Sequence, residues 1–280
     1  MNWRSLTPAV AAILPCLALL EPVYAQKEGG EAKNPAVDFK TAVDKGVAMP
    51  TPLDKFLALT YLVKTKDIDW NGTFNAIAVT IDPDKYTDTE VLIPEMLGIR
   101  IADGIMAIQA KDAEMLGKAA SDIEKLAAKV NVGGPELARA KRVRSMANDG
   151  KWMDVFRELG FLQQDIMKKL EEKPNDPRSS LVMVSGWVQG SRYSARLISQ
   201  HYSDASSNIL REPLLVAALQ AKVERLPDAI RKAPSVAKIA AALPRMHEIV
   251  NVGIDKPVSH ANVDELQKLA TECIQTVIAK

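Results

Sequence analysis

Two stretches of the chain, residues 181–204 and 91–112, are apolar around most of the circumference of the helix that their spacing predicts. At about 100° per residue, the first stretch divides into two apolar or small faces and one narrow polar strip. Arg192 and Arg196 belong to that strip. A helix with so little polar surface is typical of a protein core. We therefore expect two central helices, surrounded by smaller and more polar ones.

Glycines interrupt both stretches at helical positions. A glycine inside a helix costs about 1 kcal/mol relative to alanine, so a compensating contact is expected. Gly186, Gly190 and Ser194 form a ladder of small residues four positions apart, and Gly98 and Gly104 lie in the other stretch. Small residues in a row let another backbone approach closely. The pattern predicts a close helix–helix crossing at Gly186 and Gly190.

The rest of the chain also has helical spacing, broken by Pro, Gly and Asn clusters, and no run of strict alternation rivals it. The predicted fold class is all-α, a multi-helix bundle. Residues 76–81 fit either a short helix or a buried strand. Residues 87–90 have the spacing of a capping box, which predicts the start of the first central helix. Further helices are expected at about residues 53–64, 74–81, 116–130, 135–148, 152–170, 213–226, 236–247 and 266–277.

A weak internal repeat runs through the helical region. At an offset of 92 residues, Gly98 matches Gly190 and Arg100 matches Arg192, without any gap. Few residues are identical between the two copies, and two alanine-rich helical segments share almost as many by chance. Chance similarity is therefore the alternative to a true repeat. If the repeat is real, it implies a pseudo-twofold arrangement of the two central helices. The predicted duplicated four-helix units cover about residues 72–150 and 151–250.

The first 25 residues have the layout of a secretory signal peptide. Arg4 supplies the positive charge, residues 9–20 supply an apolar run, and the residues before Ala25 suit cleavage. The apolar run is shorter than the roughly 20 residues that a membrane span needs. Cys16 raises the alternative of a lipoprotein, but Pro15 precedes it where a small residue is expected. The mature chain is expected in the periplasm or outside the cell, without a membrane span.

Residues 26–51 are rich in Gly, Lys, Glu and Pro, and we expect a flexible leader there. Residues 52–280 are expected to form one helical domain, long enough for a sizeable core. The formal net charge is only +1, which shows no bias toward nucleic acid. Without Cys16, Cys273 is the one remaining cysteine, so no internal disulfide can form.

The search for catalytic and metal-binding motifs yields no constellation. His201, His247 and His260 lie far apart and lack ligand partners at a recognised metal spacing. There is no nucleophile elbow, phosphate loop or dinucleotide fingerprint, so neither a cofactor nor a metal is predicted. A run of basic residues is either a solvated helix face or a functional basic patch: Arg139, Lys141, Arg142 and Arg144.

Charged residues on the central helices are the remaining candidates for a site. An arginine on a mostly apolar helix needs a partner. Either a structural ion-pair network supplies it, or the guanidinium groups converge on an anionic ligand. The candidate ligand-binding residues are Arg100, Asp103, Arg192, Arg196 and His201.

These features favour an exported helical protein that binds a small anionic ligand or an envelope protein and performs no chemistry. Two alternatives stay open. One is a hydrolase or lyase that holds an anionic substrate with Arg100 and Arg192 and uses Asp103 or His201 as acid or base. The other is a purely structural envelope protein. An acid or base that opens onto the same cleft as the arginines would favour the enzyme.

The signal sequence leads to a direct prediction. Export should remove residues 1–25, so the mature protein should begin at Gln26. Intact mass spectrometry of the exported protein measures this. A start many residues away, or a lipid on Cys16, would contradict it.

Overall fold

The computed structural model describes Leu59 and residues 70–173, 176–253 and 256–279, which contain helices and no strand. This confirms the all-α class. The predicted signal peptide, the leader and most of the first predicted helix lie outside the described residues. The described residues all belong to one compact unit.

The helices follow the predicted order along the chain. They are α4 (Trp70–Ile77), α5 (Leu92–Ala110), α6 (Ala113–Lys129), α7 (Pro135–Asn148), α8 (Trp152–Glu171), α9 (Pro177–Gln200), α10 (Asp204–Ser207), α11 (Pro213–Glu224), α12 (Asp228–Arg231), α13 (Pro234–Val250) and α14 (His260–Ile278), with 3₁₀ turns η1 (Pro83–Lys85) and η2 (Asn208–Leu210).

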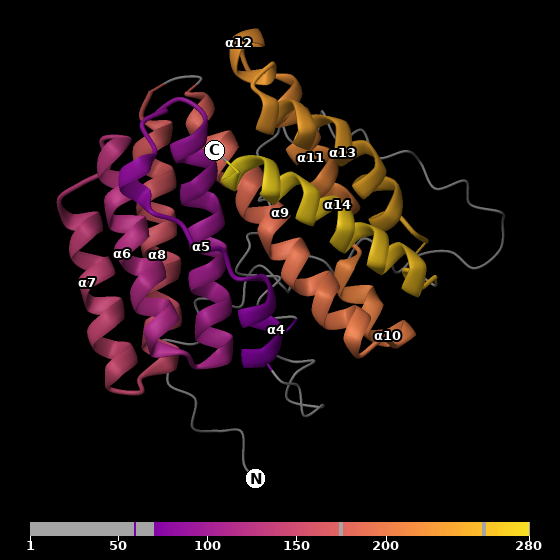
Figure 1. Ribbon diagram of the computed structural model, residues 1–280, viewed down its shortest axis with the longest axis horizontal. Coiled ribbons are helices and arrows are strands. Elements are labelled where there is room, and N and C mark those ends of the chain that lie inside the picture. Colours follow the sequence, from indigo (N-terminus) through magenta and orange to yellow (C-terminus); the bar gives the residue numbers. More distant parts are fainter. Residues whose placement is uncertain (1–58, 60–69, 174–175, 254–255, 280) are drawn as a thin grey trace, which may run out of the picture. The chain divides into compact units, whose positions relative to one another are not determined.

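The two predicted central helices, α5 and α9, pack against each other more extensively than any other pair of described elements. Successive helices α5 to α8 lie side by side in one half of Figure 1, and α9, α11, α13 and α14 pack together in the other half. One continuous hydrophobic core runs through both halves. The junction of α5 and α9 is therefore where the two halves meet.

Helix α5 is buried along almost its whole length, from Ile93 to Ile108. This follows from its sequence, which has apolar or small residues on nearly every face. The next helix is different, because α6 buries only one stripe, including Leu116 and Ile123, and exposes its charged residues. Polar outer helices thus cover an apolar central one, as predicted.

A close crossing joins α5 and α9 at Gly98 and Gly186. A Cβ atom added to Gly98 would lie 2.2 Å from the carbonyl oxygen of Val182 and 2.3 Å from Oγ of Ser185. A Cβ atom on Gly186 would lie 3.2 Å from the carbonyl oxygen of Gly98. The prediction was wrong for Gly190, which is half-buried and has nothing within 4 Å of its added Cβ. Gly190 lies one turn beyond Gly186, and a Cβ atom there would point into open space instead of toward α5.

Two local predictions also need correction. The helix expected at residues 74–81 is α4, which ends at Ile77, and neither helix nor strand covers the residues up to 81. The capping box expected at residues 87–90 is not formed. Instead, Asp88 Oδ1 accepts from the backbone N–H groups of Glu90 and Val91, and α5 begins without a side-chain cap.

The helix boundaries agree with the 92-residue repeat only at its start. The offset places α5 on α9, but it places α8 on residues 244–263, which span the end of α13, a loop and the start of α14. The duplication of a four-helix unit therefore stays a prediction.

The crossing predicts opposite effects for two chemically identical substitutions. Gly98→Ala should lower the free energy of unfolding by on the order of 1–3 kcal/mol, because its Cβ meets backbone that cannot move aside. Gly190→Ala should leave it unchanged or raise it by up to about 1 kcal/mol, because alanine favours the helix and meets no atom there. Urea unfolding of both variants measures the difference. Equal effects would show that the crossing does not constrain Gly98.

Candidate functional site

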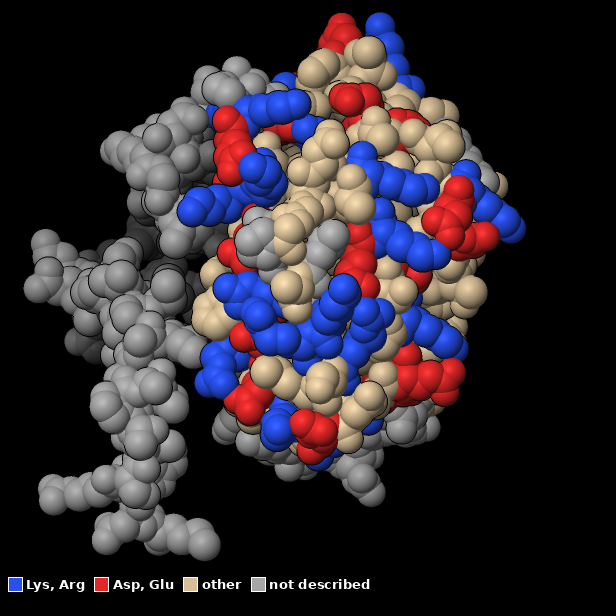
Figure 2. Space-filling model, turned by 90° about the vertical axis from the view of Figure 1, so that its left-hand side faces the viewer, with Lys and Arg blue, Asp and Glu red and all other residues tan. Residues whose placement is uncertain are grey.

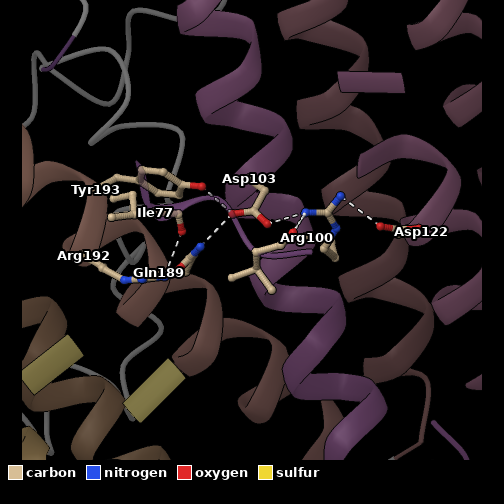
Figure 3. Close-up of polar contacts among 8 residues, drawn as sticks. Ile77, Arg100, Asp103, Asp122, Gln189, Arg192 and Tyr193 are labelled. Atoms are coloured by element: carbon tan, nitrogen blue, oxygen red, sulfur yellow. Dashed lines mark hydrogen bonds and ion pairs between the residues drawn. The ribbon is translucent and has the colours of Figure 1, made fainter. Parts of the chain in front are cut away.

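A buried carboxylate, Asp103 of α5, is the centre of a polar cluster between the two central helices (Figure 3). Its Oδ2 accepts from Arg100 at 2.5 Å, and its Oδ1 accepts from Gln189 at 2.7 Å and from the Tyr193 hydroxyl at 2.8 Å. Asp103 is 0 % exposed. Three donors from two helices therefore replace the water that a carboxylate loses on burial.

Arg100 lies between two carboxylates. Besides Asp103, it contacts Asp122 of α6, with 2.9 Å between Nη2 and Oδ2, and Nη1 also donates to the carbonyl oxygen of Val79 at 2.9 Å. The Arg100 side chain is only 3 % exposed, and its Nε has no hydrogen-bond partner. Arg100 has its counter-charge within the protein, which is the geometry of a structural ion-pair network.

Burial governs the ionisation of the groups around this network. It raises the pKa of Asp122, an effect larger than the opposing one of the Arg100 charge. It also raises the pKa of Tyr193 well above the ordinary value, and the neighbouring Asp103 adds to that shift. Tyr193 is therefore a neutral hydroxyl donor at physiological pH.

Arg192 lies on the other side of Asp103 from Arg100 in Figure 3. Its Nη1 donates to the carbonyl oxygen of Ile77 at 2.9 Å and its Nε donates to Oγ1 of Thr271 at 3.2 Å. Both partners are neutral, and burial lowers the pKa of the Arg192 guanidinium. The structure thus brings Arg100 and Asp103 together, whereas Arg192 contacts α4 and α14 instead of Arg100.

Arg196 follows one turn later on α9 and is also half-buried. Its Nε is shielded from solvent and has no hydrogen-bond partner. No carboxylate of the described chain forms an ion pair with Arg192 or Arg196. Other arginines differ: Arg178 pairs with Asp176, and Arg245 pairs with Glu248 and Glu265. The last predicted site residue, His201, is the half-buried C-cap of α9.

The basic cluster of α7 is largely neutralised by its neighbours. Arg139 contacts Glu158 and Asp165 of α8, and Arg144 contacts Glu124 of α6. Figure 2 shows that Lys and Arg side chains are interspersed with Asp and Glu on this side of the molecule. The cluster has the character of a solvated, ion-paired helix face.

One group that the sequence did not single out combines a serine, a histidine and an aspartate. Ser199 Oγ lies 2.5 Å from Asp264 Oδ1 and 3.4 Å from His260 Nε2, and the His260 ring stacks on Tyr202. A catalytic triad needs the histidine between the other two. Here Asp264 contacts Ser199 directly, so the group is not arranged as a triad. Ser199 lies 61 and 65 positions from His260 and Asp264, so no local signal in the sequence joined it to that pair.

Within the described ranges, no group of three or more His, Cys, Asp and Glu side chains could hold a metal ion, and no helix has the length and apolarity to cross a membrane. An open depression of about 510 Å³ lies beside α14. None of the candidate site residues lines it. Its lining residues are Lys238, Glu272, Gln275, Thr276 and Ala279.

Comparison of the chain with protein-family models, curated proteins and solved structures finds no match. Any function proposed for this protein therefore rests on the geometry of the site.

The cluster predicts unequal costs for two identical substitutions beside Arg100. Asp103→Asn should lower the free energy of unfolding by about 3–5 kcal/mol, because it breaks a buried pair and points an amide N–H₂ at one or two of the three donors. Asp122→Asn should cost clearly less, because Asp122 is 17 % exposed and its ionised form is already disfavoured by burial. Guanidinium unfolding measures both. Equal losses would contradict the central role of Asp103.

Proposed function

We propose that this protein is an exported helical binding protein that holds a small anion at Arg192 and Arg196 of α9. The observation that carries the proposal is the absence of an ion pair at either arginine. Among the described residues, no carboxylate pairs with either guanidinium, and the Nε of Arg196 has no hydrogen-bond partner.

A cation that is half out of water without a partner is unfavourable, and its cost falls when an anion binds. Burial already lowers the pKa of Arg192, which reflects that cost. Guanidinium groups suit this role because their N–H groups form a planar fork that matches carboxylate and phosphate oxygens. The hydroxyl of Thr271, already in contact with Arg192, lies at the same place between α9 and α14.

Binding is favoured over catalysis by the state of Asp103. A hydrolase or lyase with this site would use Asp103 as its acid or base, with access to the substrate. Asp103 is fully buried and engaged by three donors. Its role is to hold α5 and α9 together. The signal-like residues 1–25 support action in the periplasm or outside the cell.

A melting screen against phosphate, sulfate, acetate and succinate tests the proposal. At least one anion should raise the Tm in a concentration-dependent way, because a ligand that binds only the folded state stabilises it. Arg196→Gln and the double variant with Arg192→Gln should lose that rise.

Sulfate and phosphate also stabilise proteins without a site, so a matched control is needed. Arg245→Gln removes an arginine that already pairs with Glu248 and Glu265, and it should keep the full anion response. The proposal fails if no anion acts on the wild type beyond the effect seen in the double variant.

A further inference from the structure

We infer that the anion bound by this protein is a monoanion, such as a carboxylate, and that Arg196 holds it while Arg192 positions the site. This inference rests on the proposed function and specifies its ligand.

The first step is a count of the charges in the polar cluster. Arg100 and Arg192 contribute two positive charges, and Asp103 and Asp122 contribute two negative charges. Tyr193, the remaining hydroxyl of the cluster, is neutral. The four charges balance, although only Arg100 touches the carboxylates directly. The electrostatic effect of Asp103 on Arg192 supports counting them together.

Arg196 is then the unmatched charge on this part of α9. Asp264 lies near the next turn of the helix, where it accepts from Ser199. That carboxylate is 57 % exposed, lies next to His260 and forms no ion pair with Arg196. Water screens such an exposed charge. One positive charge is left for a ligand to neutralise.

The hydrogen bonds of the two arginines separate their roles. Arg192 uses Nε and Nη1 for Thr271 and Ile77, so its guanidinium plane is held by α14 and α4. The guanidinium of Arg196 donates to no described group. Because its Nε is shielded from solvent, the two terminal nitrogens are the pair that would meet two oxygens of one ligand. One guanidinium binds one carboxylate through two parallel hydrogen bonds, so one positive charge meets one negative charge. A dianion would bring a second charge without a partner into a half-buried site.

The test compares pairs of ligands that share a binding group and differ in charge. Methanesulfonate and sulfate are both tetrahedral, with one and two negative charges, and acetate and malonate form a second pair. Binding to the full mature chain is measured by calorimetry at constant ionic strength and pH 7. The monoanion of each pair should bind at least about tenfold more tightly, a difference of 1.4 kcal/mol.

Variants then separate the roles of the two arginines. Arg196→Gln should abolish binding, and Arg196→Lys should restore it only in part, because lysine keeps the charge but not the fork. Arg192→Gln should weaken binding and leave the preference for monoanions intact. Arg245→Gln should have no effect.

The outcomes distinguish this inference from the proposed function. If sulfate and malonate bind more tightly than their partners and Arg196→Gln abolishes this, the anion site stands and the monoanion is overturned. If Arg192→Gln abolishes binding and Arg196→Gln does not, the assignment of roles is overturned. If none of the four anions binds, the proposed function and this inference both fail.

Discussion

The backbone contact between α5 and α9 at Gly98 and Gly186 is the constraint on which the rest of the structure depends. At Gly98 there is no room for even one additional carbon atom, so this crossing requires glycine at that position. Such a close approach brings the adjacent turns of both helices within hydrogen-bond reach. Asp103 of α5 can then accept from Gln189 and Tyr193 of α9.

The buried carboxylate makes this crossing specific. Sliding one helix along the other would leave Asp103 without two of its three donors, in a place that water does not reach. Arg100 extends the same network to α6 through Asp122. Apolar packing stabilises the association of the helices, and the polar network selects the register in which they associate.

The balance of charge in this network also bears on function. Arg100 of α5 is neutralised inside the protein. Arg192 and Arg196 lie on α9, and among the described residues neither forms an ion pair; Arg192 contacts α4 and α14 through neutral groups. The hydrogen bonds of Arg192 to Ile77 and Thr271 connect α9 to α4 and α14. Under the proposed function, a bound anion supplies the negative charge that the described residues do not place in contact with Arg196.

The sequence by itself determined the all-α class, the order of the helices and the burial of α5 and α9, because helical periodicity is a local property of the chain. It also identified the polar residues on the buried helices. Only the tertiary structure decided which glycine makes the crossing and which arginine has a counter-charge. Those answers depend on contacts between distant residues, such as Asp103 with Gln189, 86 positions apart, and Arg192 with Ile77, 115 positions apart. Helical spacing places a side chain on a face, but its partner there is set by how the helices pack.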